Sequence, residues 1–172
     1  MTHRIPRLLL GAVVVLTACV PGQPIALKGQ EASLEPALVP VWKVGDTWSF
    51  RYESPAGNGT SVDVVLGVET VDGIECYVIR TGRFVVYAPK ANVAYYIRKD
   101  STGNIVSRHV PPLPYYAWPM TVGKQWQEST THELPQMRRT VVESATMSVE
   151  ETERVTVPAG TFDTFKIVVR DR

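Results

Sequence analysis

The 172-residue sequence predicts an all-β fold, either a single curved antiparallel sheet or an open β-barrel or sandwich. Residues 47–52 alternate between polar and apolar side chains, which is the two-residue period of a half-buried strand. Turn-forming residues recur roughly every 8–12 positions after residue 40. No segment of this region combines a helical period with capping residues, so we expect almost no helix.

The first predicted strands are separated by short turns. The aromatic residues of 47–52 share one face of the opening strand. Asn58-Gly59 predicts a hairpin, because both residues tolerate positive φ. The apolar side chains at 62, 64, 66 and 68 are expected on one face of the partner strand, and Asp72-Gly73 makes the next turn. In order, strands are expected at 47–52, 62–68, 74–81, 84–87, 93–98, 105–110, 139–149, 155–157 and 162–169.

A proline-rich loop is expected at 111–119, with prolines at 111, 112, 114 and 119. It carries Tyr115, Tyr116 and Trp118. Aromatic side chains on a loop offer contact area with a polar tip, so these three residues are candidates for a ligand or partner contact. The alternative is that the loop folds back and closes the open end of the sheet.

A short motif occurs twice, seventy-eight residues apart. VGDTW at 44–48 returns as VGKQW at 122–126, and each copy is expected to begin a strand. The repeat is consistent with an internal duplication. Independent use of a glycine at a strand entry, with a tryptophan on the core, explains it equally well.

The amino-terminal segment has the three parts of a secretory signal. Arg4 and Arg7 precede a nine-residue apolar run at 8–16, which is too short for a membrane span of about twenty residues. The exit, LTAC at 16–19, resembles the lipobox of bacterial lipoproteins. The resemblance implies that a signal peptide is removed and that Cys19 carries fatty acyl chains such as palmitate, which hold the protein on a membrane.

The expected organisation is a signal peptide at 1–18, a lipidated amino terminus and flexible linker at 19–40, and a β domain at 41–172. Prolines within 20–40 favour an extended tether. The lipobox resemblance implies a place in the cell envelope. Val20 is not the Asp that retains lipoproteins at the inner membrane. We therefore expect the outer membrane, facing the periplasm, in a diderm organism and the outer face of the cytoplasmic membrane otherwise.

Other motifs resemble an uncharacterised group of all-β bacterial envelope proteins. These motifs are the two VGxxW entries and VPAGTF at 157–162, which leads into the FKI of 165–167. The resemblance supports the fold class and implies no particular chemistry. Such proteins usually continue with more strand, so we expect either a truncation at Arg172 or an unusually abrupt edge strand.

Charge and cysteine content argue against several function classes. Removing Arg4 and Arg7 from the 18 basic residues leaves 16 against 17 acidic ones, a net charge of −1 that does not favour nucleic acid. Once Cys19 is lipidated, Cys76 is the remaining thiol, and we expect it to be a buried small hydrophobe.

No metal site or catalytic motif is expected. HELPQ at 132–136 lacks the second His of the zinc motif HExxH, and its Pro135 would break the required helix. His109 is expected to be an exposed strand histidine. A run of glutamates is expected on solvated strands, where charge discourages pairing between edges. These are Glu143, Glu150, Glu151 and Glu153.

The sequence therefore predicts a membrane-tethered, non-catalytic β domain that binds an apolar ligand or a partner protein in the cell envelope. No cofactor, metal or nucleic acid is expected. Tyr115, Tyr116 and Trp118 are the candidate contact residues, and Cys19 is the expected lipidation site. The first alternative is a structural or assembly lipoprotein without a small-molecule ligand. The second is a hydrolase whose site the sequence does not reveal.

Overall fold

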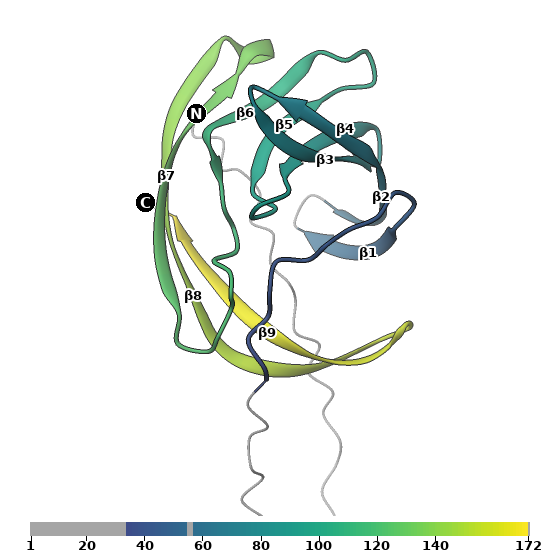
Figure 1. The fold of residues 1–172 in the computed structure, drawn as a ribbon, viewed down its shortest axis with the longest axis vertical. Helices are drawn as coiled ribbons and strands as arrows, with labels where there is room; N and C mark the ends of the chain where they lie inside the picture. The colour runs from purple at the N-terminus through teal and green to yellow at the C-terminus, as the bar shows by residue number, and fades with distance from the viewer. Residues whose placement is uncertain (1–33, 55–56, 172) are drawn as a thin grey trace, which may run out of the picture.

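The computed structural model describes residues 34–54 and 57–171, which fold into one nine-stranded antiparallel sheet. Each strand pairs with the next strand along the chain, so the spatial order is the sequence order. The sheet curves strongly, and β1 and β9 form its two edges without closing it into a barrel (Figure 1). The predicted all-β class and the curved antiparallel sheet are confirmed.

The strands agree with the expected ones most closely in the first half of the domain. β3 has the predicted bounds, and Asp72 and Gly73 in the turn before it both have positive φ, at 51° and 79°. One 3-10 turn, η1, is the only helical element in the described ranges. The elements are β1 Thr47–Ser54, β2 Gly57–Val71, β3 Ile74–Thr81, β4 Phe84–Pro89, β5 Tyr95–Lys99, β6 Ile105–Leu113, β7 Gln125–Leu134, η1 Pro135–Met137, β8 Arg139–Val157 and β9 Gly160–Asp171.

Three strands of the second half differ from the sequence-based prediction. β6 continues through Pro111 and Pro112, and neither proline has a ladder partner in the described ranges, so neither needs an N–H. β7 is missing from the expected strands apart from its VGKQW entry, because most of its residues are polar and show no clear alternation. The segments expected at 139–149 and 155–157 form one strand, β8, which stays paired with β9 across a bulge.

A second bulge, at Leu66, decides which face of β2 is buried. In the ladder with β3 the pairing steps from Val65 to Gly67 and skips Leu66. Because side chains alternate along a strand, the extra residue puts Val68 on the same face as Val65. The prediction that the side chains at 62, 64, 66 and 68 share one face is therefore wrong. Val65, at 1% exposed, is the core residue of this strand.

Both faces of β3 are buried, each in a separate apolar cluster. We call the face that bears Val65, Tyr77 and Ile79 the inner face. The opposite face bears Cys76, which is fully buried, as the sequence predicted. The inner cluster is Val65, Tyr77, Ile79, Ala88 and Val93, with Trp42, Trp48 and Trp118 packed against it. The opposite cluster is Cys76, Val78, Tyr87, Tyr96 and Ile97.

The proline-rich loop and the segment before β1 pack against each other beside the inner cluster. Ala37 and Met120 form an isolated antiparallel bridge with N···O distances of 3.0 and 2.8 Å. The indole of Trp118 donates to the carbonyl of Asn92 at 3.0 Å, and the backbone N–H of Trp42 donates to the Tyr77 hydroxyl at 3.1 Å. Residues 34–40, which the sequence assigns to the linker, thus contact the domain at Ala37.

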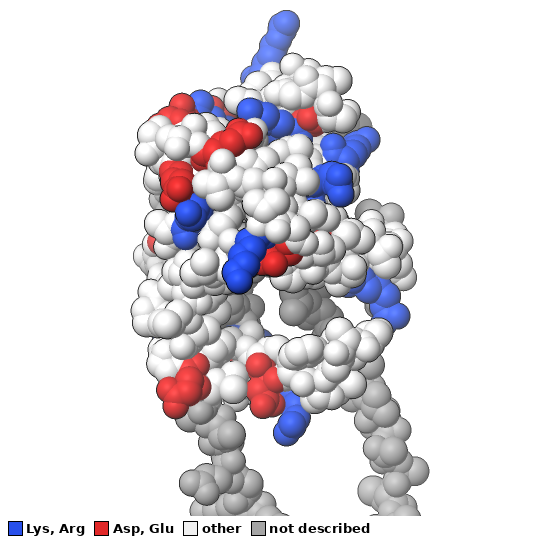
Figure 2. Space-filling model, turned by 45° about the vertical axis from the view of Figure 1, so that its right-hand side comes forward, with Lys and Arg blue, Asp and Glu red and all other residues white. Residues whose placement is uncertain are grey.

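Charged side chains of both signs are scattered over the face drawn in Figure 2. The glutamates near the carboxyl-terminal hairpin have cationic partners, for example Lys166, whose Nζ lies 2.8 Å from Glu151 and 3.5 Å from Glu153. These ion pairs are partly exposed and therefore add little stability. Within residues 34–54 and 57–171, no helix has the length and apolar character needed to cross a membrane.

Candidate functional site

A row of polar and charged side chains crosses the inner face from β5 to β8. The ladders of β3, β4 and β5 place Arg98 on the same face as Ile79. Arg98 stands directly opposite Ser107 on β6, and His109 stands directly opposite His132 on β7. Residues directly opposite each other share a face of the sheet, as do residues two apart on one strand. This register brings together residues from four strands.

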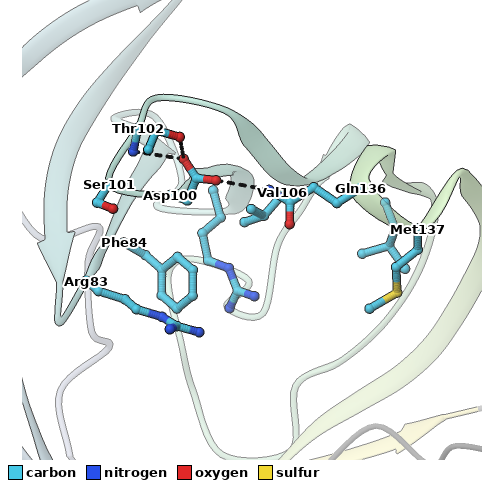
Figure 3. Close-up of a pocket in the computed structure, with 10 residues that line it drawn as sticks. Arg83, Phe84, Asp100, Ser101, Thr102, Val106, Gln136 and Met137 are labelled. Atoms are coloured by element: carbon cyan, nitrogen blue, oxygen red, sulfur yellow. Dashed lines mark hydrogen bonds between the residues drawn. The ribbon is translucent and has the colours of Figure 1, made fainter.

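A cavity of about 600 Å³ lies at one end of the row, between the turn after β3 and η1. Figure 3 shows Arg83 and Phe84 on one side of it and Gln136 and Met137 on the other. Arg98 also lines the cavity. The cavity therefore forms where the β3–β4 turn, the β5–β6 loop and η1 meet.

The two arginines of this cavity have no ion-pair partner in the described part of the chain. The Cζ atoms of Arg98 and Arg83 lie 4.4 and 4.9 Å from the ring centroid of Phe84, which is cation–π distance. Nε of Arg98 is buried and has no hydrogen-bond partner among the described residues. The cavity wall is thus aromatic and carries positive charge that no carboxylate of the described residues neutralises by contact.

Asp100, the one acidic residue lining this cavity, bonds to its own loop and to η1. Its Oδ1 accepts from the Thr102 hydroxyl at 2.7 Å and from the backbone N–H groups of Thr102 and Asn104, each at 3.0 Å. Its Oδ2 accepts from the Gln136 amide at 3.0 Å. These hydrogen bonds hold the pKa of Asp100 below its usual value, and the bond from the Thr102 hydroxyl has the largest effect. The carboxylate therefore fixes the cavity rim.

A hydrogen-bonded chain of three side chains continues the row toward β8. Oγ of Ser107 lies 2.8 Å from Nε2 of His132, and Nδ1 of His132 lies 2.7 Å from Oε1 of Glu143. The ring of His109 stacks on that of His132, with centroids 4.2 Å apart. Ser107 and His109 are only 5% and 3% exposed, whereas the Glu143 side chain is 30% exposed. The cluster is therefore closed at β6 and more open at β8.

His109 is held as a buried neutral imidazole. Burial, and next the proximity of His132, lowers the pKa of His109 to about 4. Nδ1 of His109 is buried and has no hydrogen-bond partner among the described residues. Such atoms are uncommon in native proteins and call for an explanation. The prediction of an exposed His109 is wrong, because the rings of Tyr95 and His132 pack against it.

The order Ser107, His132, Glu143 matches that of a nucleophile, a general base and an orienting acid. Acyl transfer also requires that the hydroxyl meet a substrate, and Ser107 is buried and does not line the 600 Å³ cavity. In this conformation the chain of hydrogen bonds orients the His132 ring and does not present an open nucleophile.

The same cluster has the donor atoms of a metal site. One donor atom each from His109, His132 and Glu143 lies within 4.8 Å of the other two. Imidazole nitrogen and carboxylate oxygen are ligands that zinc takes in proteins. Sequence reasoning missed this group, because its members are 23 and 11 residues apart and only the strand register joins them. The HELPQ motif does not contribute as a helical zinc motif, since its first residues lie in β7.

The contact residues predicted from the sequence lie away from the cavity. Tyr115 and Tyr116 are 40% and 42% exposed, and neither they nor Trp118 line it. Trp118 packs against the inner cluster, with its ring centroid 5.6 Å from that of Tyr116. Cys19 lies outside the described residues.

Comparisons of this chain with models of protein families, with curated proteins and with solved structures found no match.

Proposed function

We propose that this chain is a lipid-anchored protein of the bacterial cell envelope whose β domain binds a small anionic ligand without catalysis. The observation that carries the ligand class is the pair of unneutralised arginines, Arg83 and Arg98, in the cavity beside η1. The proposed anchoring rests on the lipobox resemblance at residues 16–19.

An anion from outside the chain would satisfy groups that have no partner among residues 34–54 and 57–171. Burying a guanidinium nitrogen without a hydrogen-bond partner costs free energy, and Nε of Arg98 is buried in this way. A carboxylate or phosphate accepts two parallel hydrogen bonds from one guanidinium. Stacking on Phe84 already restricts the side chains of Arg83 and Arg98, so binding would cost less side-chain entropy.

The lining residues favour an anionic ligand over the purely apolar one expected from the sequence. Two arginines and one aspartate give the wall a net charge of +1, that is, 2 − 1. Leu134 and Met137 add apolar surface to the same wall. The volume, about 600 Å³, lies in the range typical of small-molecule sites. A ligand with an acidic head group and a short apolar part therefore fits best.

Isothermal titration calorimetry with phenyl phosphate tests this proposal on the full-length chain in a non-ionic detergent. Phenol serves as the neutral control ligand. We expect phenyl phosphate to bind and added salt to weaken it, because the attraction is ionic. Replacing Arg98 with Met keeps the apolar stem and removes the charge, so affinity should fall by roughly tenfold or more.

Arg80→Gln is the matched control variant, because Arg80 is an exposed arginine of β3 that does not line the cavity. It should leave the affinity for phenyl phosphate within about twofold of the original. Equal binding of phenol and phenyl phosphate, or an Arg98→Met variant with unchanged affinity, would show that the cavity does not select an anion.

A second candidate function, binding of a partner protein, rests on Tyr115 and Tyr116. These neighbouring side chains are both substantially exposed on a loop that Trp118 holds against the core. Tyrosine is enriched among the residues that dominate protein interfaces. Native mass spectrometry of the protein extracted from membranes distinguishes the two candidate functions. A protein subunit that is bound in a fixed ratio and is lost in the Tyr116→Ser variant supports a partner protein. A bound small acidic molecule supports the cavity as a ligand site.

A further inference from the structure

We propose that His109, His132 and Glu143 bind one divalent transition-metal ion, for which zinc is the best-suited class. The three side chains come from β6, β7 and β8, and their donor atoms lie within 4.8 Å of one another. The site is distinct from the arginine cavity, whose lining contains none of the three residues. It does not depend on the anionic ligand proposed above.

An unpaired buried nitrogen is the second, independent observation. Nδ1 of His109 has no hydrogen-bond partner in the described ranges, although only 3% of the residue is exposed. Leaving such an atom unsatisfied costs about 1–3 kcal/mol in typical proteins. A metal ion beside Nδ1 would remove that cost.

The donor set suits zinc with an open coordination position. Two imidazoles and one carboxylate are a known ligand set of zinc sites that keep a fourth position for water or substrate. With bonds of about 2.0–2.2 Å, tetrahedral ligand atoms lie roughly 3.4 Å apart. The three donor atoms, which lie within 4.8 Å of one another, would therefore have to come closer by about 1 Å, and we assign this change to rotation of the side chains.

Binding requires the histidine rings to turn. The rings of His109 and His132 are stacked with an interplanar angle of 18°, so their lone pairs lie in two nearly parallel planes and do not both point at one ion. If His132 binds through Nδ1, its Nε2 can still donate to Ser107, which lies 2.8 Å away. Such a bond from the other ring nitrogen is the usual support of a metal-bound histidine. Ser107 is then a positioning residue, and the open end at Glu143 gives the ion access.

The test is zinc titration of the full-length chain, purified in detergent with a tag that lacks histidine and stripped with a chelator. The sequence has three histidines, and the third, His3, falls in the expected signal peptide, so competing histidine sites are few. We expect one zinc ion per chain by calorimetry. Cobalt in the same site should show the visible absorption of a tetrahedral ion.

Variants assign the site to these residues. His109→Gln and Glu143→Gln should each weaken zinc binding by about tenfold or more, and Ser107→Ala by a smaller factor. Glu150→Gln is the matched control, since Glu150 lies on the same strand, is exposed and pairs with Arg170. Circular dichroism checks that each variant is folded. If His109→Gln does not fold, Glu143→Gln still tests the site, because the glutamine side chain keeps a hydrogen-bond partner for His132.

Two results would overturn the proposal: no zinc binding by the folded chain, or equal binding by the original chain and Glu143→Gln. Phenyl phosphate binding measured on the same samples separates this outcome from failure of the anion cavity. If the chain still binds phenyl phosphate but does not bind zinc, the metal-site proposal is wrong and the proposal of an anion cavity stands.

Discussion

At the scale of single residues, buried nitrogen atoms without hydrogen-bond partners mark both candidate sites. In the described part of the chain these atoms are Nδ1 of His109 and the Nε atoms of Arg98 and Arg108. Arg108 differs from the other two, because another nitrogen of its guanidinium donates to Asp72 at 2.6 Å and its charge is paired. The remaining two atoms lie on one face of the sheet, one at the arginine cavity and one at the histidine cluster.

Cys76 should be almost inert in the folded protein. Burial, and next the charge of Asp72, raises the pKa of its thiol to about 11, so little thiolate exists at pH 8. In a Cys19→Ser background, where Cys76 is the only thiol, we expect N-ethylmaleimide to react at least about 100-fold faster in urea than in buffer. Mass spectrometry measures both rates. Rapid stoichiometric labelling of the folded chain would contradict the burial of Cys76.

The same raised pKa gives the sign of a pH effect on stability. Above the ordinary thiol pKa of 9.0, the unfolded chain loses its Cys76 proton while the folded chain keeps it up to about pH 11. The free energy of unfolding should therefore fall between these two pH values, and the part due to Cys76 should vanish in Cys76→Ala. Urea unfolding at pH 8, 9 and 10 measures the difference between the two proteins.

Trp118→Ala should destabilise the domain much more than Tyr116→Ala. Trp118 packs against the inner cluster and donates to Asn92, whereas Tyr116 is 42% exposed and is not among the residues packed on that cluster. Removing a packed tryptophan typically costs about 3 kcal/mol, and removing a half-exposed tyrosine roughly 1 kcal/mol. Urea unfolding followed by circular dichroism measures both values. Similar costs for the two variants would mean that the proline-rich loop is not part of the core.

At the scale of elements, bulges let long strands stay paired while the sheet curves. In the β8–β9 ladder the pairing steps from Val149 to Glu151, so Glu150 is an extra residue without a partner opposite it. Met147 and Val149, just before the bulge, are fully or almost fully buried. The bulge therefore separates the buried half of β8 from its exposed half near the hairpin tip.

Deleting Glu150 should be tolerated, and deleting Ser148 should not. Loss of Glu150 leaves every other pair of the β8–β9 ladder unchanged and removes only an exposed ion pair with Arg170. Loss of Ser148 would move Glu150 into the buried position of Val149, which places an unpaired charge in the core. Thermal unfolding compares the two deletions. A Glu150 deletion as damaging as that of Ser148 would contradict the assigned bulge.

At the scale of the whole molecule, the proposed anchor and the two candidate sites are separate parts of one chain. The segment before β1 reaches the domain at Ala37, which bridges to Met120 in the proline-rich loop. The arginine cavity lies instead at the end of the sheet formed by the β3–β4 turn, the β5–β6 loop and η1. Loss of the anchor should therefore change where the protein is found without changing what it binds.

Cys19→Ser should move the protein from the membrane fraction to the soluble fraction, because the thiol is the proposed acceptor of the lipid. Mass spectrometry of the original protein should show a lipid-modified amino terminus at Cys19. Cys76→Ala, the control at the other cysteine, should stay in the membrane fraction. Unlipidated protein that begins at another residue would contradict the lipoprotein proposal.

Local patterns in the sequence were sufficient for the fold class and for most of the strands in the first half of the domain. The bounds of β3 and the Asp72-Gly73 turn were predicted correctly, because alternation and positive φ depend on neighbouring residues alone. The buried state of Cys76 followed from its apolar neighbours in the same way. The bulges at Leu66 and Glu150 were not predicted, since an extra residue in a strand is defined only by the partner strand.

The candidate sites depend on tertiary structure. Ser107, His109, His132 and Glu143 carry no recognisable spacing in the sequence, and strand register alone brings them within hydrogen-bonding or stacking distance. The arginine cavity likewise needs the loop after β5 to be tied to η1 through Asp100. Sequence alone thus determined the all-β class and the strands with clear alternation, because those signals are local. Tertiary structure decided the candidate sites, because both sites depend on contacts between residues far apart in the chain.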